Sequence, residues 1–183
     1  MKQANLHAGD IVVVLALSSA PGSQLSRLAG LAGRSIGECH NAIRRLRASG
    51  LVNVDRRSVE REPLIRFLDA GVRVAFPPTI GGETVGVATA FVSSARPDDP
   101  SAGPLAHDHP VAAEFVWPLA GAVTRGQALA PLHPRVALLA STNRELWNLL
   151  AMVDLIRVGG AREHREALER LRLELTRDRS DNG

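Results

Sequence analysis

Residues 33–52, GRSIGECHNAIRRLRASGLV, constrain the fold more than any other stretch of this chain. Ser35 and Glu38 have the spacing of a capping box, in which each side chain bonds the backbone N–H of the other residue at the start of a helix. The sequence therefore predicts a helix over 35–49 that is closed by Gly50. At about 100° per residue, one stripe of this helix is apolar and expected to be buried. It consists of Ile36, Cys39, Ile43 and Leu46.

The same stretch contains a Gly-x-Ser-x-Gly string at Gly33, Ser35 and Gly37, which is also the signature of a hydrolase nucleophile elbow. An elbow holds its serine between a buried strand and a helix. Residues 24–32 have a helical pattern instead, so Ser35 is interpreted as a helix cap. The sequence predicts no enzyme, no catalytic residue and no cofactor, and a hydrolase that uses Ser35 is kept only as an alternative.

The face of the predicted helix opposite the apolar stripe is polar and basic. It carries Gly37, Asn41, Arg44, Arg45 and Ala48, with His40 and Arg47 at its margins. Residues 1–60 hold eight basic and four acidic groups, whereas residues 61–140 hold six and seven, and residues 141–183 hold eight and eight. The net charge of +3 therefore comes from the N-terminal third, which favours an anionic partner there over the alternative of a solvated, arginine-rich surface.

Hydrophobic spacing and turn residues predict the neighbouring elements. The apolar run 11–17 is interpreted as a helix, and Ser23 is expected to cap a second helix that reaches Ala32. A strand over 51–54, a turn over 55–58 and a short helix over 62–70 follow, with Pro63 in the first turn of that helix. Alternation of apolar and other residues predicts a strand over 72–76.

The C-terminal part has a different composition. Residues 77–135 are rich in proline and glycine, and short strands are expected at 84–92, 113–117 and 127–132, with a turn over 81–86 and an exposed loop over 93–110. An apolar helix over 142–158, capped by Thr142 or Asn143, and an amphipathic helix over 161–176 complete the chain. The predicted class is α+β, with one domain over 1–76 and a mixed region of short strands and two C-terminal helices over 77–183.

The order of elements in residues 6–76 is helix, turn, capped helix, strand and turn, and it resembles the winged helix-turn-helix family in the style of MarR-like transcriptional regulators. Residues 23–32 match the positioning helix and residues 35–49 the recognition helix. The string IRRLRASGLV, a helix that ends in a small residue and Gly50 before an apolar strand, is frequent in this family. The wing has to fit between Val54 and Glu62 and is therefore short.

The resemblance implies roles for individual residues at DNA. A recognition helix in the major groove presents exposed side chains to the base edges, where Asn41 suits adenine and Arg44 or Arg45 suits guanine. Gly37 permits a close approach, and His40 lies beside these readers. The remaining candidates suit phosphates, because contacts with phosphates fix the position of the protein on DNA without reading its sequence. These are Arg34, Ser35, Arg47, Arg56 and Arg57.

Other candidate sites are weaker. Cys39 is the single cysteine, and its place on the apolar stripe favours a core residue over a redox sensor. His107 and His109, with Glu114 or His133, do not have a recognised metal-ligand spacing, so no metal site is predicted. The run 11–17 is shorter than the ~20 residues of a membrane span, and a cytoplasmic protein without a membrane partner is expected.

These observations predict a homodimeric regulator of transcription, a repressor or an activator, that binds double-stranded DNA at a palindromic operator through helix 35–49. The dimer is expected because the helix over 142–158 is apolar almost all the way round. The alternative is an antitoxin-like or other protein-interaction module, whose N-terminal domain regulates its own operon while residues 77–183 hold an operon-encoded partner.

Overall fold

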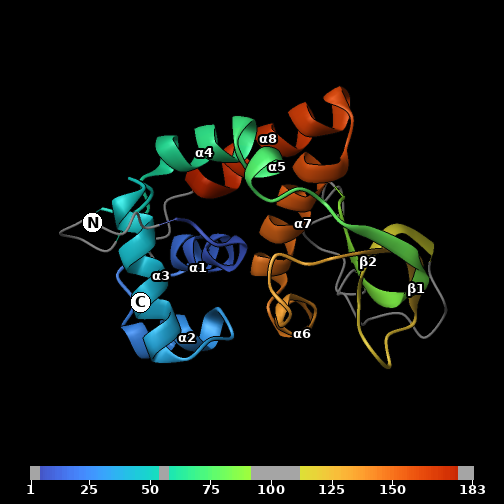
Figure 1. Cartoon of the computed structure of the whole chain (residues 1–183), viewed down its shortest axis with the longest axis horizontal. Helices are drawn as coiled ribbons and strands as arrows, with labels where there is room; N and C mark the ends of the chain where they lie inside the picture. Colours follow the sequence, from blue (N-terminus) through green and yellow to red (C-terminus); the bar gives the residue numbers. More distant parts are fainter. Residues whose placement is uncertain (1–4, 54–57, 92–111, 177–183) are drawn as a thin grey trace.

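The computed structural model describes residues 5–53, 58–91 and 112–176, which form an α+β fold (Figure 1). Within these residues, eight helices accompany one small sheet of three strands. The helices are α1 (Ala8–Ser19), α2 (Leu25–Leu31), α3 (Ile36–Ala48), α4 (Arg61–Ala70), α5 (Val72–Ala75), α6 (Val136–Thr142), α7 (Arg144–Val158) and α8 (Ala161–Thr176). The strands are β1 (Ile80–Thr89), β2 (Ala112–Pro118) and β3 (Thr124–Leu129).

Helix α1 lies at the centre of the helical part. Each residue from 11 to 17 is at most 1% exposed. Helices α2 and α3 contact α1, and so does α7, which stands between the N-terminal helices and the sheet (Figure 1). The prediction of a helix over 11–17 is confirmed, because burial on all sides outweighs the slightly lower helix propensity of its β-branched residues.

The predicted helix after Gly33 is also confirmed, with two differences in its surroundings. Helix α3 begins after Ser35 as N-cap and ends with Ser49 as C-cap. Ile36 is 54% exposed, so its predicted burial is wrong: it is the first residue of the helix, and the buried stripe runs instead through Cys39, Ala42, Ile43 and Leu46. Helix α2 starts one residue later than expected, since Gln24 and not Ser23 is its N-cap.

A short hairpin follows α3. Val52 and Val59 form a single antiparallel bridge, flanked by hydrogen bonds from Asn53 N to Ser58 O (2.8 Å) and from Glu60 N to Leu51 O (2.9 Å). The strand predicted over 51–54 is thus reduced to one bridge in the described residues. Residues 54–57, on which most of the predicted turn falls, lie outside them.

The strand predicted over 72–76 is wrong, because this segment forms α5. After Gly71 the backbone is helical, and Ala75 N and Phe76 N donate to Gly71 O and Val72 O. Alternation suggested a strand with one buried face, but Val74 is 82% exposed while Val72 is buried. The helical hydrogen bonds formed directly after α4 determine the conformation of this segment, and the period-two pattern does not.

The three strands close into a small barrel (Figure 1). Strand β1 pairs antiparallel with both β2 and β3, which pair parallel with each other. Gly86 lies opposite Pro118 on one side and Thr124 on the other, and a Cβ there would stand 2.1 Å from the Trp117 carbonyl oxygen. A glycine at this position is what lets β1 approach β2 so closely.

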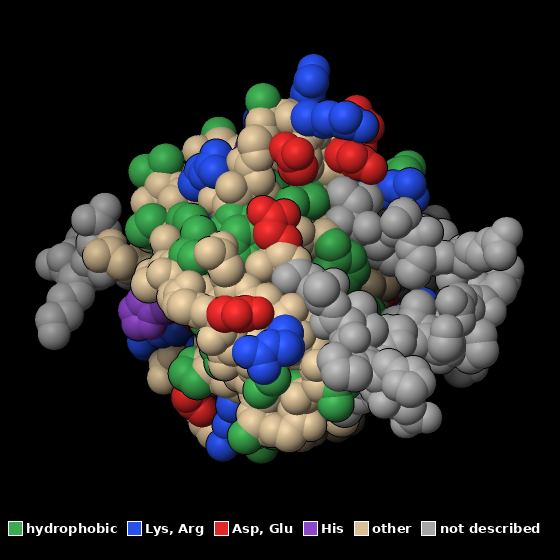
Figure 2. Space-filling model, turned by 90° about the vertical axis from the view of Figure 1, so that its right-hand side faces the viewer, with side chains coloured by type: hydrophobic (Ala, Val, Ile, Leu, Met, Phe, Trp, Pro, Cys, Tyr) green, Lys and Arg blue, Asp and Glu red, His purple; other side chains and the backbone are tan. Residues whose placement is uncertain are grey.

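The strands depart from the predicted boundaries. Strand β1 starts earlier than residue 84, so the segment 81–86 is part of a strand and not a turn. Strand β3 begins at Thr124, three residues before the predicted start, and β2 agrees within one residue. The loop predicted over 93–110 lies outside the described residues. Figure 2 shows the barrel end of the molecule, where acidic and basic side chains are intermixed.

The two predicted C-terminal helices are confirmed as α7 and α8, and Asn143 caps α7 by accepting from Leu146 N (3.1 Å). Sequence reasoning missed α6, which is only seven residues long. Helix α8 packs against α7 and α4, so the C-terminus of the described chain returns to the N-terminal helices (Figure 1). The buried residues of α1 and α7 belong to one hydrophobic core that spans both sides of the expected boundary near residue 76.

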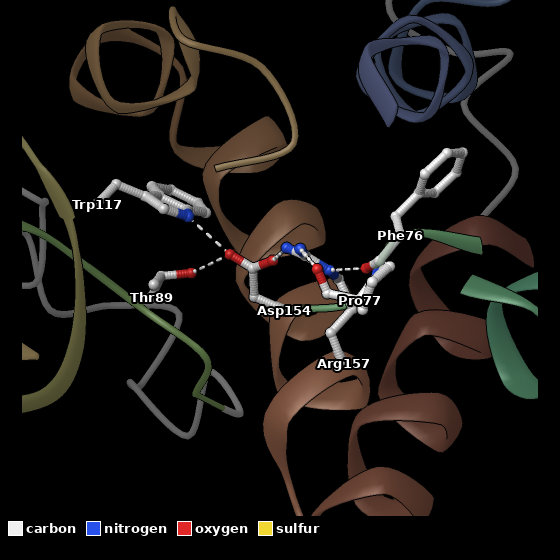
Figure 3. Close-up of polar contacts among 6 residues, drawn as sticks. All are labelled: Phe76, Pro77, Thr89, Trp117, Asp154 and Arg157. Atoms are coloured by element: carbon white, nitrogen blue, oxygen red, sulfur yellow. Dashed lines mark hydrogen bonds and ion pairs between the residues drawn. The ribbon is translucent and has the colours of Figure 1, made fainter. Parts of the chain in front are cut away.

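A buried polar network joins the barrel to α7 (Figure 3). The fully buried Asp154 carboxylate accepts hydrogen bonds from Trp117 Nε1 (2.6 Å) and Thr89 Oγ1 (3.0 Å), and it pairs with Arg157. Burial raises the pKa of Asp154, while the Arg157 guanidinium and the two neutral donors oppose that rise. Arg157 also donates to the carbonyl oxygens of Phe76 and Pro77, which connects both halves of the chain.

We expect Asp154→Ala to lower the free energy of unfolding by about 3–5 kcal/mol, because it leaves the Arg157 guanidinium buried without its counter-charge. Urea unfolding followed by circular dichroism measures this loss. Glu83→Ala is the control, since the Glu83–Arg125 pair is exposed and contributes about 0–1 kcal/mol. Equal losses for the two variants would contradict a stabilising role of the network.

Candidate nucleic-acid interface

Ser35 fixes the start of α3 through three hydrogen bonds with Glu38. Glu38 N donates to Ser35 Oγ (3.2 Å), while Ser35 N (2.9 Å) and Ser35 Oγ (2.7 Å) both donate to Glu38 Oε2. These bonds hold the pKa of Glu38 below its usual range, the bond from the Ser35 backbone most of all. The prediction that Ser35 caps this helix is confirmed.

The position of Ser35 differs from that of an elbow serine. It follows α2 and a turn, in which Arg34 N donates to Ala29 O, and no strand precedes α3 among the described residues. The Ser35 hydroxyl donates to a carboxylate instead of facing a histidine base. The geometry at Ser35 is therefore that of a cap.

The outer face of α3 is exposed along its whole length. Gly37, Asn41, Arg44 and Ala48 lie at successive helical turns on this face, and His40 lies beside them; all five are exposed. The side chains of Asn41 and Arg44 form no hydrogen bond or ion pair with any residue in the described ranges. These residues, which the sequence predicts to meet DNA, are brought together on one surface.

Arg45 is placed differently from the other candidates. Its Nε and Nη2 atoms both donate to the carboxylate of Asp10 at 2.7 Å, and the side chain is only 15% exposed while that of Asp10 is fully buried. Asp10 also accepts from His7 N (2.9 Å) at the start of α1. A bidentate pair of this kind ties α3 to α1 and leaves the Arg45 guanidinium unavailable for base contacts.

The candidate phosphate ligands lie at both ends of α3. Arg34 and Arg47 are half-buried, and the Nε atom of each is buried without a hydrogen-bond partner in the part of the chain that the structure describes. Ser35 is exposed at the N-terminal end. Arg56 and Arg57 lie outside the described residues.

Sequence reasoning missed a cation that the fold brings to this surface. Arg135 is exposed, and its Nη1 atom donates to Gly33 O at 3.4 Å, across 102 positions in the chain. His133 lies close enough to Arg34 and Glu38 to feel their charges. No local pattern near residue 135 points to α3, so only the tertiary structure reveals this proximity.

Cys39 is a core residue, as its place on the apolar stripe predicts. Its side chain is fully buried, and burial raises the pKa of the thiol, which disfavours the reactive thiolate. The described residues contain no group of three or more histidine, cysteine or carboxylate side chains placed to hold a metal ion. His107 and His109 lie outside them. None of the helices described is long and apolar enough to cross a membrane.

Comparison with known proteins assigns no family to this chain. No family model, curated protein or solved structure matches the chain. The described surface offers a capped helix whose outer face carries one amide and one free guanidinium, with further cations at its ends. Such a set can form bidentate bonds to base edges and ion pairs to phosphates.

We expect Ser35→Ala to destabilise the protein by about 1 kcal/mol, because it removes the cap of α3. The pKa of Glu38 should rise towards its ordinary value, as measured by NMR titration. The lowered pKa stabilises the folded wild type above the ordinary carboxyl range, and this contribution is lost as the pH falls through the lowered value. The share of this pH dependence that depends on the Ser35 hydroxyl should be lost in the variant, whereas the larger share from the backbone N–H of residue 35 should remain. Ser26→Ala, at an exposed serine of α2, is the control and should leave the pKa of Glu38 unchanged.

We expect Arg45→Ala and Arg44→Ala to differ in stability. Loss of the Arg45 guanidinium leaves the Asp10 carboxylate buried and unpaired, which costs about 3 kcal/mol or more. Arg44 is exposed, and its replacement should change the free energy of unfolding by no more than about 0.5 kcal/mol. Chemical denaturation of both variants measures the difference, and a stable Arg45→Ala protein would refute the structural role of this pair.

Proposed function

We propose that this protein is a sequence-specific, double-stranded-DNA-binding regulator of transcription that reads the major groove with the outer face of α3. The observation that carries the proposal is the exposed row of Gly37, Asn41 and Arg44 on a capped helix. A recognition helix uses such a row to reach base edges. Arg34, Ser35 and Arg47 supply phosphate contacts at its ends.

The order of elements around α3 supports the same proposal. Helix α2, a turn and α3 pack on α1, and the hairpin bridged by Val52 and Val59 follows directly. This order resembles that of a winged helix-turn-helix domain, as in MarR-like regulators, and it supports the proposal. The charge distribution adds to it, because the positive excess comes from residues 1–60.

The dimer needs a different surface from the one that the sequence suggests. The residues of α7 from Leu149 to Arg157 are all buried within the chain, and α7 contacts α1, α5, α6, α8 and β1. The apolar side chains around α7 are therefore already covered within one copy of the chain. We propose that a dimer on a palindromic operator, if formed, uses surface residues outside α7, and sedimentation of the free protein and of its DNA complex measures the stoichiometry.

A partner-binding module is the second candidate, and one observation favours it. Ile80 on β1 and Val123 before β3 are large apolar side chains exposed on the barrel half of the chain. A protein partner would cover such residues, whereas DNA would not. Purification from the native host separates the candidates: a stoichiometric protein on residues 77–183 favours this module, and co-purified DNA fragments favour the regulator.

We expect Arg44→Ala to weaken binding to the DNA fragments that wild-type protein enriches from a genome. It should also reduce the slope of log K against log salt by about 1 if Arg44 contacts a phosphate. If Arg44 reads guanine, it should relax the preference at one base position by about 1–3 kcal/mol. Asn41→Ala should relax the preference at an adjacent position without changing the salt slope, because it removes no charge. Competition binding over a salt series measures all of these effects.

Arg162→Ala is the matched control, because this exposed arginine at the start of α8 removes the same charge away from α3. It should leave both affinity and preference unchanged. Loss of affinity by the Arg162 variant equal to that of the Arg44 variant would show that any cation serves. Absence of binding by wild-type protein would remove the proposed function altogether.

A further inference from the structure

The segment between β3 and α6 lies against the turn between α2 and α3. We call residues 130–135, APLHPR, the strap. Its first residue donates from Ala130 N to Thr79 O (2.9 Å), and Leu132 is buried in the core. The strap leads directly into α6, which lies between the N-terminal helices and the barrel (Figure 1).

Two contacts hold the end of the strap on the turn. Arg135 donates to Gly33 O, and the Leu139 side chain of α6 packs on Gly33, where an added Cβ would lie 3.0 Å from it. Gly33 has a φ of +61°, a conformation in which a side chain would be strained in addition to colliding with Leu139. The strap therefore has a fixed place beside the N-terminal end of α3.

Two arginines lie near the start of α3, together with His133 and Glu38. The Arg34 guanidinium lies over Gly9, with His133 next to the same glycine, and Arg135 reaches the turn through its bond to Gly33 O. The charge of Glu38 acts on His133, and its Oε2 atom already accepts two bonds from Ser35. Within the described residues, neither Arg34 nor Arg135 has a carboxylate partner. The surface carries more positive charge than the protein itself compensates.

We propose that the strap is part of the DNA interface, in which Arg135 and Arg34 contact the phosphates that flank the bases read by α3. This inference rests on the proposed function and deepens it, because it assigns a DNA contact to the C-terminal half of the chain. Two guanidinium groups near the start of one helix can pair with phosphates along the groove that the helix enters. The phosphate backbone of duplex DNA is the ligand, and base identity has no influence at this contact.

The test compares Arg135→Gln with wild-type protein in binding to a duplex that wild type selects from genomic DNA, over a salt series. We expect binding to weaken severalfold and the slope of log K against log salt to fall by about 1, with base preference unchanged. Arg135→Lys keeps the charge and should restore the slope. Arg125→Gln, which removes an exposed arginine from the barrel, should behave as wild type.

A merely structural role of Arg135 has a different result. If Arg135 only anchors the turn through Gly33, Arg135→Gln and Arg135→Lys both lower the melting temperature and weaken binding, and neither variant changes the salt slope. An unchanged salt slope for Arg135→Gln, together with weakened binding by Arg44→Ala, overturns the role of the strap and leaves the proposed function intact. Absence of DNA binding by wild-type protein overturns both.

Discussion

The burial of α1 on all sides is the constraint on which the rest of the fold depends. An apolar helix without a polar face has no side that can be left to water, so neighbouring elements must surround it. Helices α2 and α3 cover it from one direction and α7 from another. Because the inner side of α3 packs on α1, its outer face is the side that can contact a partner. The buried Asp10–Arg45 pair fixes α3 against the start of α1.

The barrel depends on the helical core through a small number of polar groups. Asp154 on α7 accepts from Thr89 on β1 and Trp117 on β2, so one carboxylate fixes two strands against one helix. Arg157 extends the network to the carbonyl oxygens that precede β1. A network of this kind is costly to leave incomplete, since each buried charge relies on the others. It follows that the barrel has a defined orientation relative to α7 and, through the strap, relative to α3.

Local sequence patterns predict the long helices of this protein and miss what depends on tertiary contacts. Caps and hydrophobic spacing locate α3, α7 and α8 within about two residues, because Ser35, Asn143 and Gly159 mark their ends chemically. The strand predicted from the period-two pattern over 72–76 does not form, because this short segment adopts the helical conformation of the residues before it. The start of β1 is missed because Gly81, Gly82 and Gly86 resemble turn residues, whereas close packing in a three-stranded barrel requires a glycine at Gly86.

In the candidate site, too, local sequence patterns predict some features, and others depend on tertiary contacts. Exposure of Asn41 and Arg44 follows from helical spacing alone, and the structure agrees. Arg45 and Arg44 are adjacent in sequence and equally basic, so the sequence treats them alike; only the buried carboxylate of Asp10, 35 positions away, separates their roles. Arg135 is the converse case, a residue with no local signal that tertiary structure brings to the start of α3. Long-range pairing thus decides which arginines are available to a partner.

The diversion of Arg45 limits what one copy of α3 can read under the proposed function. Asn41 and Arg44 are the remaining side chains on its outer face that suit bidentate base contacts, and each good pair contributes about 1–3 kcal/mol of discrimination. Two pairs therefore distinguish sites by about four orders of magnitude at most, while a genome offers roughly 10⁶–10⁹ competing sites. The phosphate contacts proposed for Arg34, Arg47 and Arg135 would raise affinity for every sequence alike and would not close this gap. A second copy of α3 on the same DNA would double the discrimination energy. Selective binding therefore argues for two chains on one operator, although α7 is buried within each chain and does not join them.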